Sequence, residues 1–445
     1  MRVLARLRAG LAGTLMVGCL TTAAWADTTV VRFLHNETDP PSIEFFNQAI
    51  AEFEAQNPDI QIKMEAVSTD GRLQKVLASI NAKTMPDIFK ILPEERYDFA
   101  RKGYILPLDD MIDEIGRSDY VDGTLVPIEG KIYDVPYTIG NYGVLWQRDD
   151  LLKAKGLKTP TNWDELEADA KALAGDGNYG FIFPAGKNRM TSIFFSMMMW
   201  NAGGTYFDKD LNLTFDNPGT IKALTFLKTM AAYSPSGIGS YSYNDMINVY
   251  LTGKIGLDIY APRLAANAAA NTPDLFKNTS AMPMPTGPSG VAVKFANANS
   301  FALASPKVGA KNVDAARKFL EFITTGDRLA GFSLTAYPHL IPPLKSVQQG
   351  VLTKGAAQTL SAREDIGRLA FDTSNTLDFQ TEAGAVFNDG KVVRSGIFNP
   401  YIGAIIARDI PAQVVQRVVL QGEDPAEAAA WGQAQMKRIV DDLKS

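Results

Sequence analysis

The sequence is short of cysteine, of histidine and of long apolar runs. It holds one cysteine, Cys19, and two histidines among 445 residues. A disulfide framework is therefore excluded, and a zinc site made of cysteine and histidine has too few ligands. After the first 26 residues, no apolar run reaches the about 20 residues of a membrane helix. The fold must be stabilised by core burial without cross-links.

Catalytic motifs and basic runs are also missing. The chain has no Gly-x-Ser-x-Gly, no HExxH, no phosphate loop and no cysteine nucleophile. Its formal charge is −5, and no basic run stands out, so a nucleic-acid partner is not expected. Carboxylates are plentiful, so a glycosidase-like pair of acids stays open as an alternative.

The N-terminus has the layout of a secretory signal peptide. Arg2, Arg6 and Arg8 precede the apolar stretch "AGLAGTLMVGCL", and "AWA" ends at Ala26. We expect cleavage after Ala26. "MVGC" around Cys19 is a weak lipoprotein box, which leaves a lipid-anchored form as the alternative. Cleavage removes three of the 44 basic side chains and none of the 49 acidic ones, so the mature chain would carry a formal charge of −8.

Strand-like and helix-like segments alternate along the chain. "TTVVRFLHNE" and "IQIKMEAV" are typical of strands, and "PSIEFFNQAIAEFEAQNP" between them has helical spacing of apolar residues. "DGRLQKVLASINAKTMPDIFKIL" adds a helix and a short strand, and similar units recur up to the helical C-terminal region. This rhythm predicts α/β domains with parallel strands, which bind ligands beyond the carboxyl ends of the strands.

Several stretches resemble the family 1 extracellular solute-binding proteins of ABC transporters, the group that binds carbohydrates. They are, in family order, "FEAQNPDIQI", "MPDIF" with "ARKGYILPLDD", "GKIYDVPYTIGNYGVLWQRDDLLKAKGLKTPTNWDEL", "NAGGTYFD", "YLTGKIGLDIYAP", "AMPMPTGPSG", "FALASP" with "AARKFLEFITTGD", and "LIPPLKSV". No single stretch is highly specific, but eight in the family's order are. The resemblance covers almost all of the mature chain.

The resemblance implies a two-lobed, type II-like periplasmic-binding-protein fold. Each lobe would be a mixed, mainly parallel sheet flanked by helices, and a multi-strand hinge would join the lobes. We expect an N-terminal lobe of residues 27–138 plus 297–344 and a C-terminal lobe of 139–296 plus 345–445. The resemblance places the three crossings at "VPYTIGNYGV", at "KFANANSF" and near "HLIPPLKSV".

A sugar-binding site needs aromatic rings that stack on the C–H faces of the sugar and polar side chains that form hydrogen bonds with its hydroxyls. The polar cluster "HNETD" follows the first strand, and the resemblance also points to the first crossing and to the loop after "PDIF". A metal site at "HNETD" is not favoured, because no further ligands lie at suitable spacing. Packing beneath the hinge is an equal alternative for the tyrosine at 137. The candidate ligand contacts here are His35, Asn36, Glu37, Asp39, Glu94, Tyr137, Asn141 and Tyr142.

In the second half, "GKNRMTSIFFSMMMWNAGG" and "IYAPRLAA" are the informative stretches. Arg263 stands where many relatives carry a stacking aromatic residue. An arginine can hold hydroxyls, but it also suits a carboxylate or phosphate, so an acidic or substituted sugar is an open hypothesis. For the tryptophan at 200, packing in the core is an equal alternative to stacking on a sugar. The candidates from this half are Asn188, Arg189, Thr191, Trp200, Asn201, Tyr260, Arg263, Asn297, Asn299, His339 and Tyr401.

The sequence thus predicts a periplasmic, monomeric binding protein of an ABC importer. It would capture a carbohydrate by lobe closure and deliver it to the membrane permease, with no cofactor and no catalysis. The alternatives are a secreted glycan-degrading enzyme and an adhesion or scaffold module.

Overall fold

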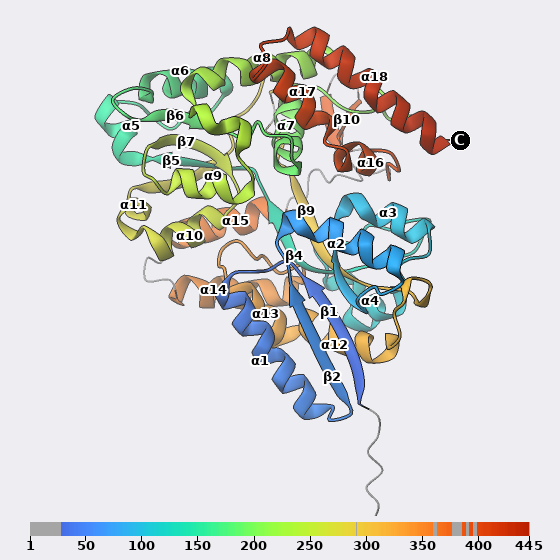
Figure 1. Cartoon of the computed structure of the whole chain (residues 1–445). Coiled ribbons are helices and arrows are strands. Elements are labelled where there is room, and N and C mark those ends of the chain that lie inside the picture. Colours follow the sequence, from blue (N-terminus) through green and yellow to red (C-terminus); the bar gives the residue numbers. More distant parts are fainter. Residues whose placement is uncertain are drawn as a thin grey trace, which may run out of the picture.

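Two lobes, each built on one β-sheet, make up the protein (Figure 1). The computed structural model describes residues 28–290, 292–358, 363–375, 385–388, 391–394 and 398–444. The expected signal peptide, including Cys19 and the cleavage position after Ala26, lies outside the described residues. The predicted two-lobed α/β fold is confirmed.

The first lobe holds a five-stranded sheet in the order β2-β1-β3-β9-β4. Strand β1 pairs in parallel with β2 and β3, whereas β9 runs antiparallel to both β3 and β4. The strands are β1 (Thr29–His35), β2 (Ile60–Ala66), β3 (Ile88–Ile91), β4 (Val135–Asn141) and β9 (Ala296–Leu303).

Helices cover both faces of this sheet. Helix α1 begins at two prolines after Asp39, whose side chain accepts a hydrogen bond from Ser42 N, and its buried Phe46, Ala49 and Phe53 lie at helical spacing. These side chains share one core with α12 and α13, and α2 and α3 contribute to a second core on the other face. The helices of this lobe are α1 (Pro40–Gln56), α2 (Thr69–Ala82), α3 (Pro93–Arg101), α4 (Asp109–Ile115), α12 (Val313–Thr324), α13 (Gly326–Leu334) and α14 (Lys345–Gln358).

The second lobe holds a four-stranded sheet in the order β6-β7-β5-β8, with one large core. Its strands are β5 (Val144–Arg148), β6 (Tyr179–Ile182), β7 (Ile255–Tyr260) and β8 (Thr279–Pro283). Its helices are α5 (Asp149–Lys155), α6 (Trp163–Leu173), α7 (Arg189–Asn201), α8 (Pro218–Met230), α9 (Tyr243–Tyr250), α10 (Arg263–Asn271), α11 (Pro273–Lys277), α16 (Ile402–Ala407), α17 (Ile410–Val419) and α18 (Pro425–Lys444). A separate antiparallel pair joins β10 (Ala385–Asn388) to β11 (Lys391–Arg394).

The strand pairings are more evenly mixed than the mainly parallel sheets that we expected. In the second sheet, β6 and β7 are parallel, but β5 is antiparallel to both β7 and β8. The reason lies in the crossings between lobes. Strand β5 continues directly from β4, and β9 returns from β8, so each sheet receives a strand that runs against its neighbours.

The crossing strands approach each other closely at Gly143. A side chain there would place its Cβ 2.6 Å from Lys294 Cβ, and the neighbouring Tyr142 N donates to Phe295 O at 3.0 Å. The segment expected to make the third crossing stays with the first lobe, because Ile139 N donates to Ile341 O at 2.8 Å.

Helix α15 (Glu364–Asn375) contributes to both lobes. Its Ile366 lies in the core of the second lobe, and Ala370 and Phe371 lie in a core of the first. Val347 and Val351 of α14 also lie in a core of the first lobe. The lobe boundaries of the sequence analysis stay a prediction. In the part of the chain that the structure describes, none of the helices combines the length and hydropathy that crossing a membrane requires.

Candidate functional site

A cavity of about 240 Å³ lies between the two lobes. Its walls are mostly polar, and both lobes supply them. The lining residues of the first lobe are Asn36, Glu37, Thr38, Asp39, Ser68, Lys90, Leu92, Thr138, Asn299, His339 and Leu340. From the hinge and the second lobe come Tyr142, Asn188, Arg189, Met190, Ser242, Tyr243, Asn244, Arg263 and Asn267.

Glu37 is the centre of the charged part of the site. It follows β1 at the carboxyl end of that strand, and its side chain is 9% exposed. Its Oε1 accepts a hydrogen bond from the Tyr137 hydroxyl at 2.7 Å and lies 3.5 Å from Lys90 Nζ. The backbone N–H of Glu37 donates to His35 Nδ1 at 3.2 Å. The carboxylate is therefore held by two side chains of the first lobe alone.

Arg263 connects this carboxylate to the second lobe. It is the first residue of α10, which follows β7, and its side chain is 13% exposed. One guanidinium nitrogen lies 3.6 Å from Glu37 Oε2, and another lies 3.6 Å from Asp39 Oδ2. The pair crosses the cavity, so it forms only when the lobes stand close together.

A second ion pair also crosses between the lobes. Arg189, at the start of α7, pairs with Glu94 in the first turn of α3, through Nε to Oε1 and through Nη2 to Oε2 at 3.1 Å. Asn188 caps α7 by accepting from Thr191 N at 3.1 Å, and its amide donates to Tyr241 O at 3.0 Å. Asn188 thereby fixes the helix end from which Arg189 reaches the first lobe.

Burial and neighbouring charges set the protonation states of these groups. Burial alone would raise the pKa of Glu37, but Lys90, Arg263 and the Tyr137 hydroxyl lower it to about 2. Burial lowers the pKa of Lys90 to about 8 against the pull of Glu37. Burial would also raise the pKa of Glu94, but Arg189 brings it below its ordinary value. Both glutamates are ionised at neutral pH.

Two tyrosines and a histidine form the aromatic part of the lining. The rings of Tyr142 and Tyr243 stand edge to face, with centroids 6.4 Å apart. The Tyr243 hydroxyl lies 3.5 Å from His339 Nε2, across the gap between the lobes. Burial and the nearby Arg263 lower the pKa of His339 well below its ordinary value, so this imidazole is neutral at neutral pH.

The structure brings nine of the nineteen predicted contact residues together around this cavity. They are Asn36, Glu37, Asp39, Tyr142, Asn188, Arg189, Arg263, Asn299 and His339. Their contact with a ligand stays a prediction. The other ten do not line the cavity, and their positions within the described residues have physical reasons.

Three of these ten support residues that line the cavity. Tyr137 stacks on Phe301, with centroids 4.2 Å apart, and holds Glu37 from below. Glu94 anchors Arg189, and the buried Tyr260 donates from its hydroxyl to Tyr243 O at 2.8 Å. These three side chains hold lining residues in position and do not line the cavity themselves.

The remaining seven are structural in their contacts. Trp200 stacks on Phe295 within the core, and Asn201 clamps Val293 by accepting from its N–H at 2.9 Å and donating to its C=O at 2.7 Å. His35 packs between two phenylalanines, with centroids 5.0 Å and 4.5 Å away. Thr191 lies in the first turn of α7, and Asn141 lies at the first crossing. Asn297 of β9 lies beside Gly140 of β4, and the ring of Tyr401 stacks on Phe207.

Sequence reasoning missed several lining residues, above all Lys90, Tyr243 and Asn267. Lys90 lies inside the buried run of β3, where an apolar residue would be expected. A lysine within such a run is itself a signal, because burial of a charge requires a partner. Tyr243 and Asn267 lie on short helices and have no comparable signal.

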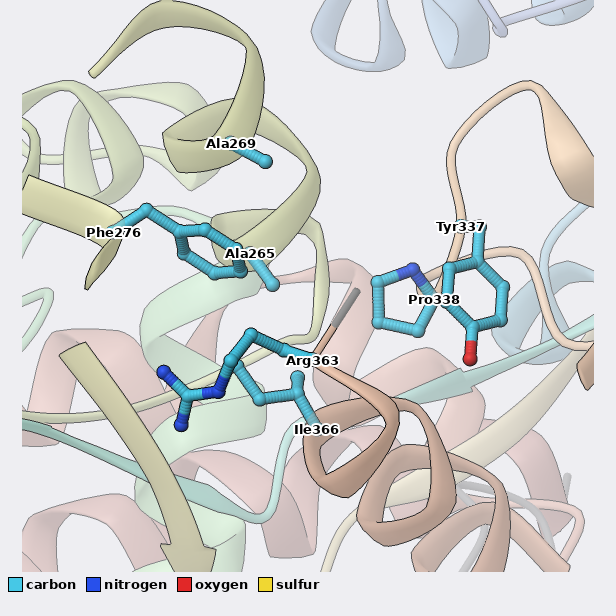
Figure 2. A pocket seen from close by; sticks show the side chains of 7 residues that line it. All are labelled: Ala265, Ala269, Phe276, Tyr337, Pro338, Arg363 and Ile366. Atoms are coloured by element: carbon cyan, nitrogen blue, oxygen red, sulfur yellow. The ribbon is translucent and has the colours of Figure 1, made fainter. Parts of the chain in front are cut away.

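A smaller cavity, of about 20 Å³, lies on the other side of α10 (Figure 2). In Figure 2, Ala265, Ala269 and Phe276 stand opposite Tyr337 and Pro338, and Arg363 and Ile366 of the α15 region lie below. Its volume suffices for about one water molecule, so it is a packing gap between the lobes. In the described part of the chain, no group of three or more His, Cys, Asp or Glu could hold a metal ion.

Comparison with known proteins adds independent information. A model of the bacterial extracellular solute-binding protein family matches residues 39–326. A binding protein of Brucella abortus is 31% identical over 333 residues, which cover 73% of this chain and 79% of the relative. The diacetylchitobiose-binding protein of Streptomyces coelicolor is 24% identical over 377 residues, which cover 82% of this chain and 83% of the relative.

A solved structure shares the fold. It is a solute-binding protein of an ABC transporter from Agrobacterium radiobacter, in complex with ribitol. The TM-score is 0.76 at 19% sequence identity, and the match covers 93% of this chain and 99% of the other.

Proposed function

Because this chain belongs to the family of bacterial extracellular solute-binding proteins, we propose that it is the substrate-binding component of an ABC importer and captures a carbohydrate between its lobes. The observation that carries the proposal is the cavity between the lobes, whose polar walls come from both. A ligand there bonds to the two lobes at once.

Capture works by closure of the lobes. A ligand that bridges them stabilises the closed state relative to the open one. To turn a mostly open population into a mostly closed one, the ligand must favour the closed state about 10⁴-fold, or about 5.5 kcal/mol. Hydrogen bonds to charged groups contribute about 1.5–3 kcal/mol each, so a few new bonds across the gap suffice. Arg189 and Arg263 already reach across it.

The chemistry of the walls favours a compound with several hydroxyls. Amides, hydroxyls and guanidinium groups alternate around the cavity and can donate to and accept from hydroxyls, and Tyr142 and Tyr243 offer ring faces. The volume of about 240 Å³ is below the about 300–1,000 Å³ of pockets for drug-sized ligands, which favours a small sugar or polyol. The named ligands of the compared proteins, diacetylchitobiose and ribitol, support this class.

We propose no catalysis. The family consists of binding proteins, and the carboxylates nearest the cavity are each engaged with a cation. A glycan-degrading enzyme needs a carboxylic acid that can donate a proton near neutral pH, with a raised pKa. The pKa values of Glu37 and Glu94 are lowered instead.

The family and the N-terminal sequence support a place of action outside the cytoplasm. We propose export by the signal peptide of residues 1–26, a periplasmic location, and work as a monomer that docks on the membrane permease. The formal charge of −5 agrees with the absence of a nucleic-acid partner.

A thermal-shift screen with sugars and polyols tests the proposed function. A true ligand at 100 times its dissociation constant adds about 2.7 kcal/mol to the free energy of unfolding. Chromatography of the recovered ligand must show it unchanged. A panel without any stabilising sugar, or a ligand returned as cleavage products, would contradict the proposal.

A further inference from the structure

The cations at the cavity all face carboxylates of the protein itself. Lys90 lies 3.5 Å from Glu37, and Arg263 lies 3.6 Å from both Glu37 and Asp39. Arg189 makes its two contacts to Glu94, which stands behind it in the first lobe. Among the described residues at the cavity, three cations are therefore matched by three carboxylates: Lys90, Arg189 and Arg263 by Glu37, Asp39 and Glu94.

The protonation states preserve this balance at neutral pH. The lowered pKa values keep Glu37 and Glu94 ionised, and the lowered pKa of His339 keeps that ring neutral. His35, beside the cavity, is also neutral, because burial lowers its pKa to about 4. Burial raises the pKa of Glu95 against the pull of Arg72, and as long as Glu95 is ionised the pair Arg72–Glu95 behind Lys90 adds no net charge. In the closed arrangement, an enclosed molecule is thus surrounded by polar walls whose charges balance.

We propose that the ligand of this site carries no net charge, and that the carboxylates of the protein occupy the positions an acidic ligand would need. This inference deepens the proposed function and rests on it. A ligand carboxylate would have to share Arg263 or Arg189 with a glutamate that is already ionised, which leaves one negative charge in excess in a closed site. A buried charge without a partner of opposite sign is strongly unfavourable.

An acidic ligand could avoid this unfavourable charge only by displacing a protein carboxylate, but both glutamates are held in place. Glu37 is fixed from three directions, by the Tyr137 hydroxyl at 2.7 Å, by Lys90 and by Arg263. The Glu94 side chain is 5% exposed and is held by two hydrogen bonds from Arg189. Hydroxyls of an uncharged ligand can instead use the remaining N–H groups of both guanidinium groups without disturbing either pair.

Matched pairs of sugars test the inference directly. Isothermal titration calorimetry would compare D-glucose with D-glucuronate, D-galactose with D-galacturonate, and D-glucitol with D-gluconate. We expect the neutral member of a binding pair to bind at least about 100-fold more tightly, the size of a lost buried ion pair. An acidic member that binds as well as its neutral partner, or better, would overturn the inference and leave the proposed function standing. Binding by no member of any pair would count against both.

Removing one carboxylate should reverse part of this preference. Glu94→Gln leaves Arg189 without its carboxylate, and Glu37→Gln leaves Lys90 without one while Arg263 keeps Asp39, so each variant leaves one cation unmatched. We expect the ratio of the affinity for the neutral sugar to the affinity for its acidic partner to fall at least about 10-fold in either variant.

The control is Glu65→Gln, which removes the same charge from an exposed pair with Lys75 outside the cavity and should leave the ratio unchanged. Glu94→Gln keeps the test valid if Glu37→Gln fails to fold. An unchanged ratio in the folded carboxylate variants would contradict the inference.

Discussion

At the scale of single residues, Arg263 is the side chain that links the two halves of the site most directly. It begins α10 in the second lobe and contacts two carboxylates on the loop after β1 in the first. Glu37 keeps Lys90 and Tyr137 when Arg263 is removed, so the first lobe retains its local order. The arginine therefore matters more for closure than for folding.

Arg263→Gln should weaken ligand binding by about 10- to 100-fold, because the closed state loses its charge-assisted contacts across the gap. Titration calorimetry with the ligand found by the thermal-shift screen measures the effect. The matched control is Arg328→Gln, which breaks an exposed pair with Glu52 on the outside of the first lobe. Equal affinities of the two variants would show that Arg263 has no part in capture.

His35 gives a prediction about pH. Burial lowers its pKa from 6.5 to about 4, so between these values the unfolded chain binds a proton that the folded chain does not. The free energy of unfolding must then fall as the pH falls through this range, by about 3 kcal/mol for this residue. His35→Phe retains the ring packing against Phe33 and Phe46 and should remove that part of the decrease.

Urea unfolding of both proteins at pH 7 and pH 4.5 measures the difference. His339 still titrates in the variant, so some decrease remains. The same loss of stability in wild type and variant would mean that His35 is not the neutral, buried ring described above.

The limits of sequence reasoning are clear at this scale. "HNETD" was identified because a polar cluster after a strand must lie at the strand's carboxyl end, and four of its five residues line the cavity. Trp200 and Asn201 were of the right chemical types, but residue type does not say which way a side chain faces. Every residue of α7 from Met190 to Asn201 is buried, so its sequence carries no polar face to orient it.

At the scale of elements, α16 of the second lobe packs directly against α3 of the first. Gly403 of α16 lies against the backbone of Glu94, and a Cβ there would come within 2.7 Å of the carbonyl oxygen. Since the obstacle is backbone, a side chain cannot be accommodated by a rotamer change. The glycine permits the lobes to close.

Gly403→Leu should therefore hold the lobes apart and reduce ligand affinity at least about 10-fold, a loss of about 1.4 kcal/mol. Small-angle scattering with ligand present should give a larger radius of gyration than wild type. The control is Gly350→Leu on the exposed face of α14, where a Cβ meets nothing within 4 Å. Unchanged affinity in Gly403→Leu would exclude this contact from the closed state.

The order of elements could largely be predicted, but the pairing of strands could not. Helical spacing in α1 and the β-branched run of β1 are local signals, and both elements formed where expected. Strand direction depends on where the chain crosses between lobes. Ile341 and Pro343 pair with the first lobe through backbone hydrogen bonds, which leave no trace in the side-chain pattern.

At the scale of the whole molecule, the expected export signal gives a simple prediction. Protein secreted by a suitable bacterial host should begin at Asp27, because the small residues Ala24 and Ala26 fit signal peptidase. Intact-mass spectrometry of the exported protein measures this. A mass that corresponds to lipidated Cys19 as the first residue would favour the anchored form instead.

The central claim is that two lobes close around a solute and release it chemically unchanged. Both cross-lobe ion pairs and the Tyr243–His339 contact require the closed arrangement, and a ligand that contacts both lobes is expected to favour that arrangement further. Small-angle scattering of the wild-type protein, with and without the neutral sugar that stabilises it, tests this most directly. The account predicts a smaller radius of gyration with the sugar bound. An unchanged radius at saturating sugar would contradict it.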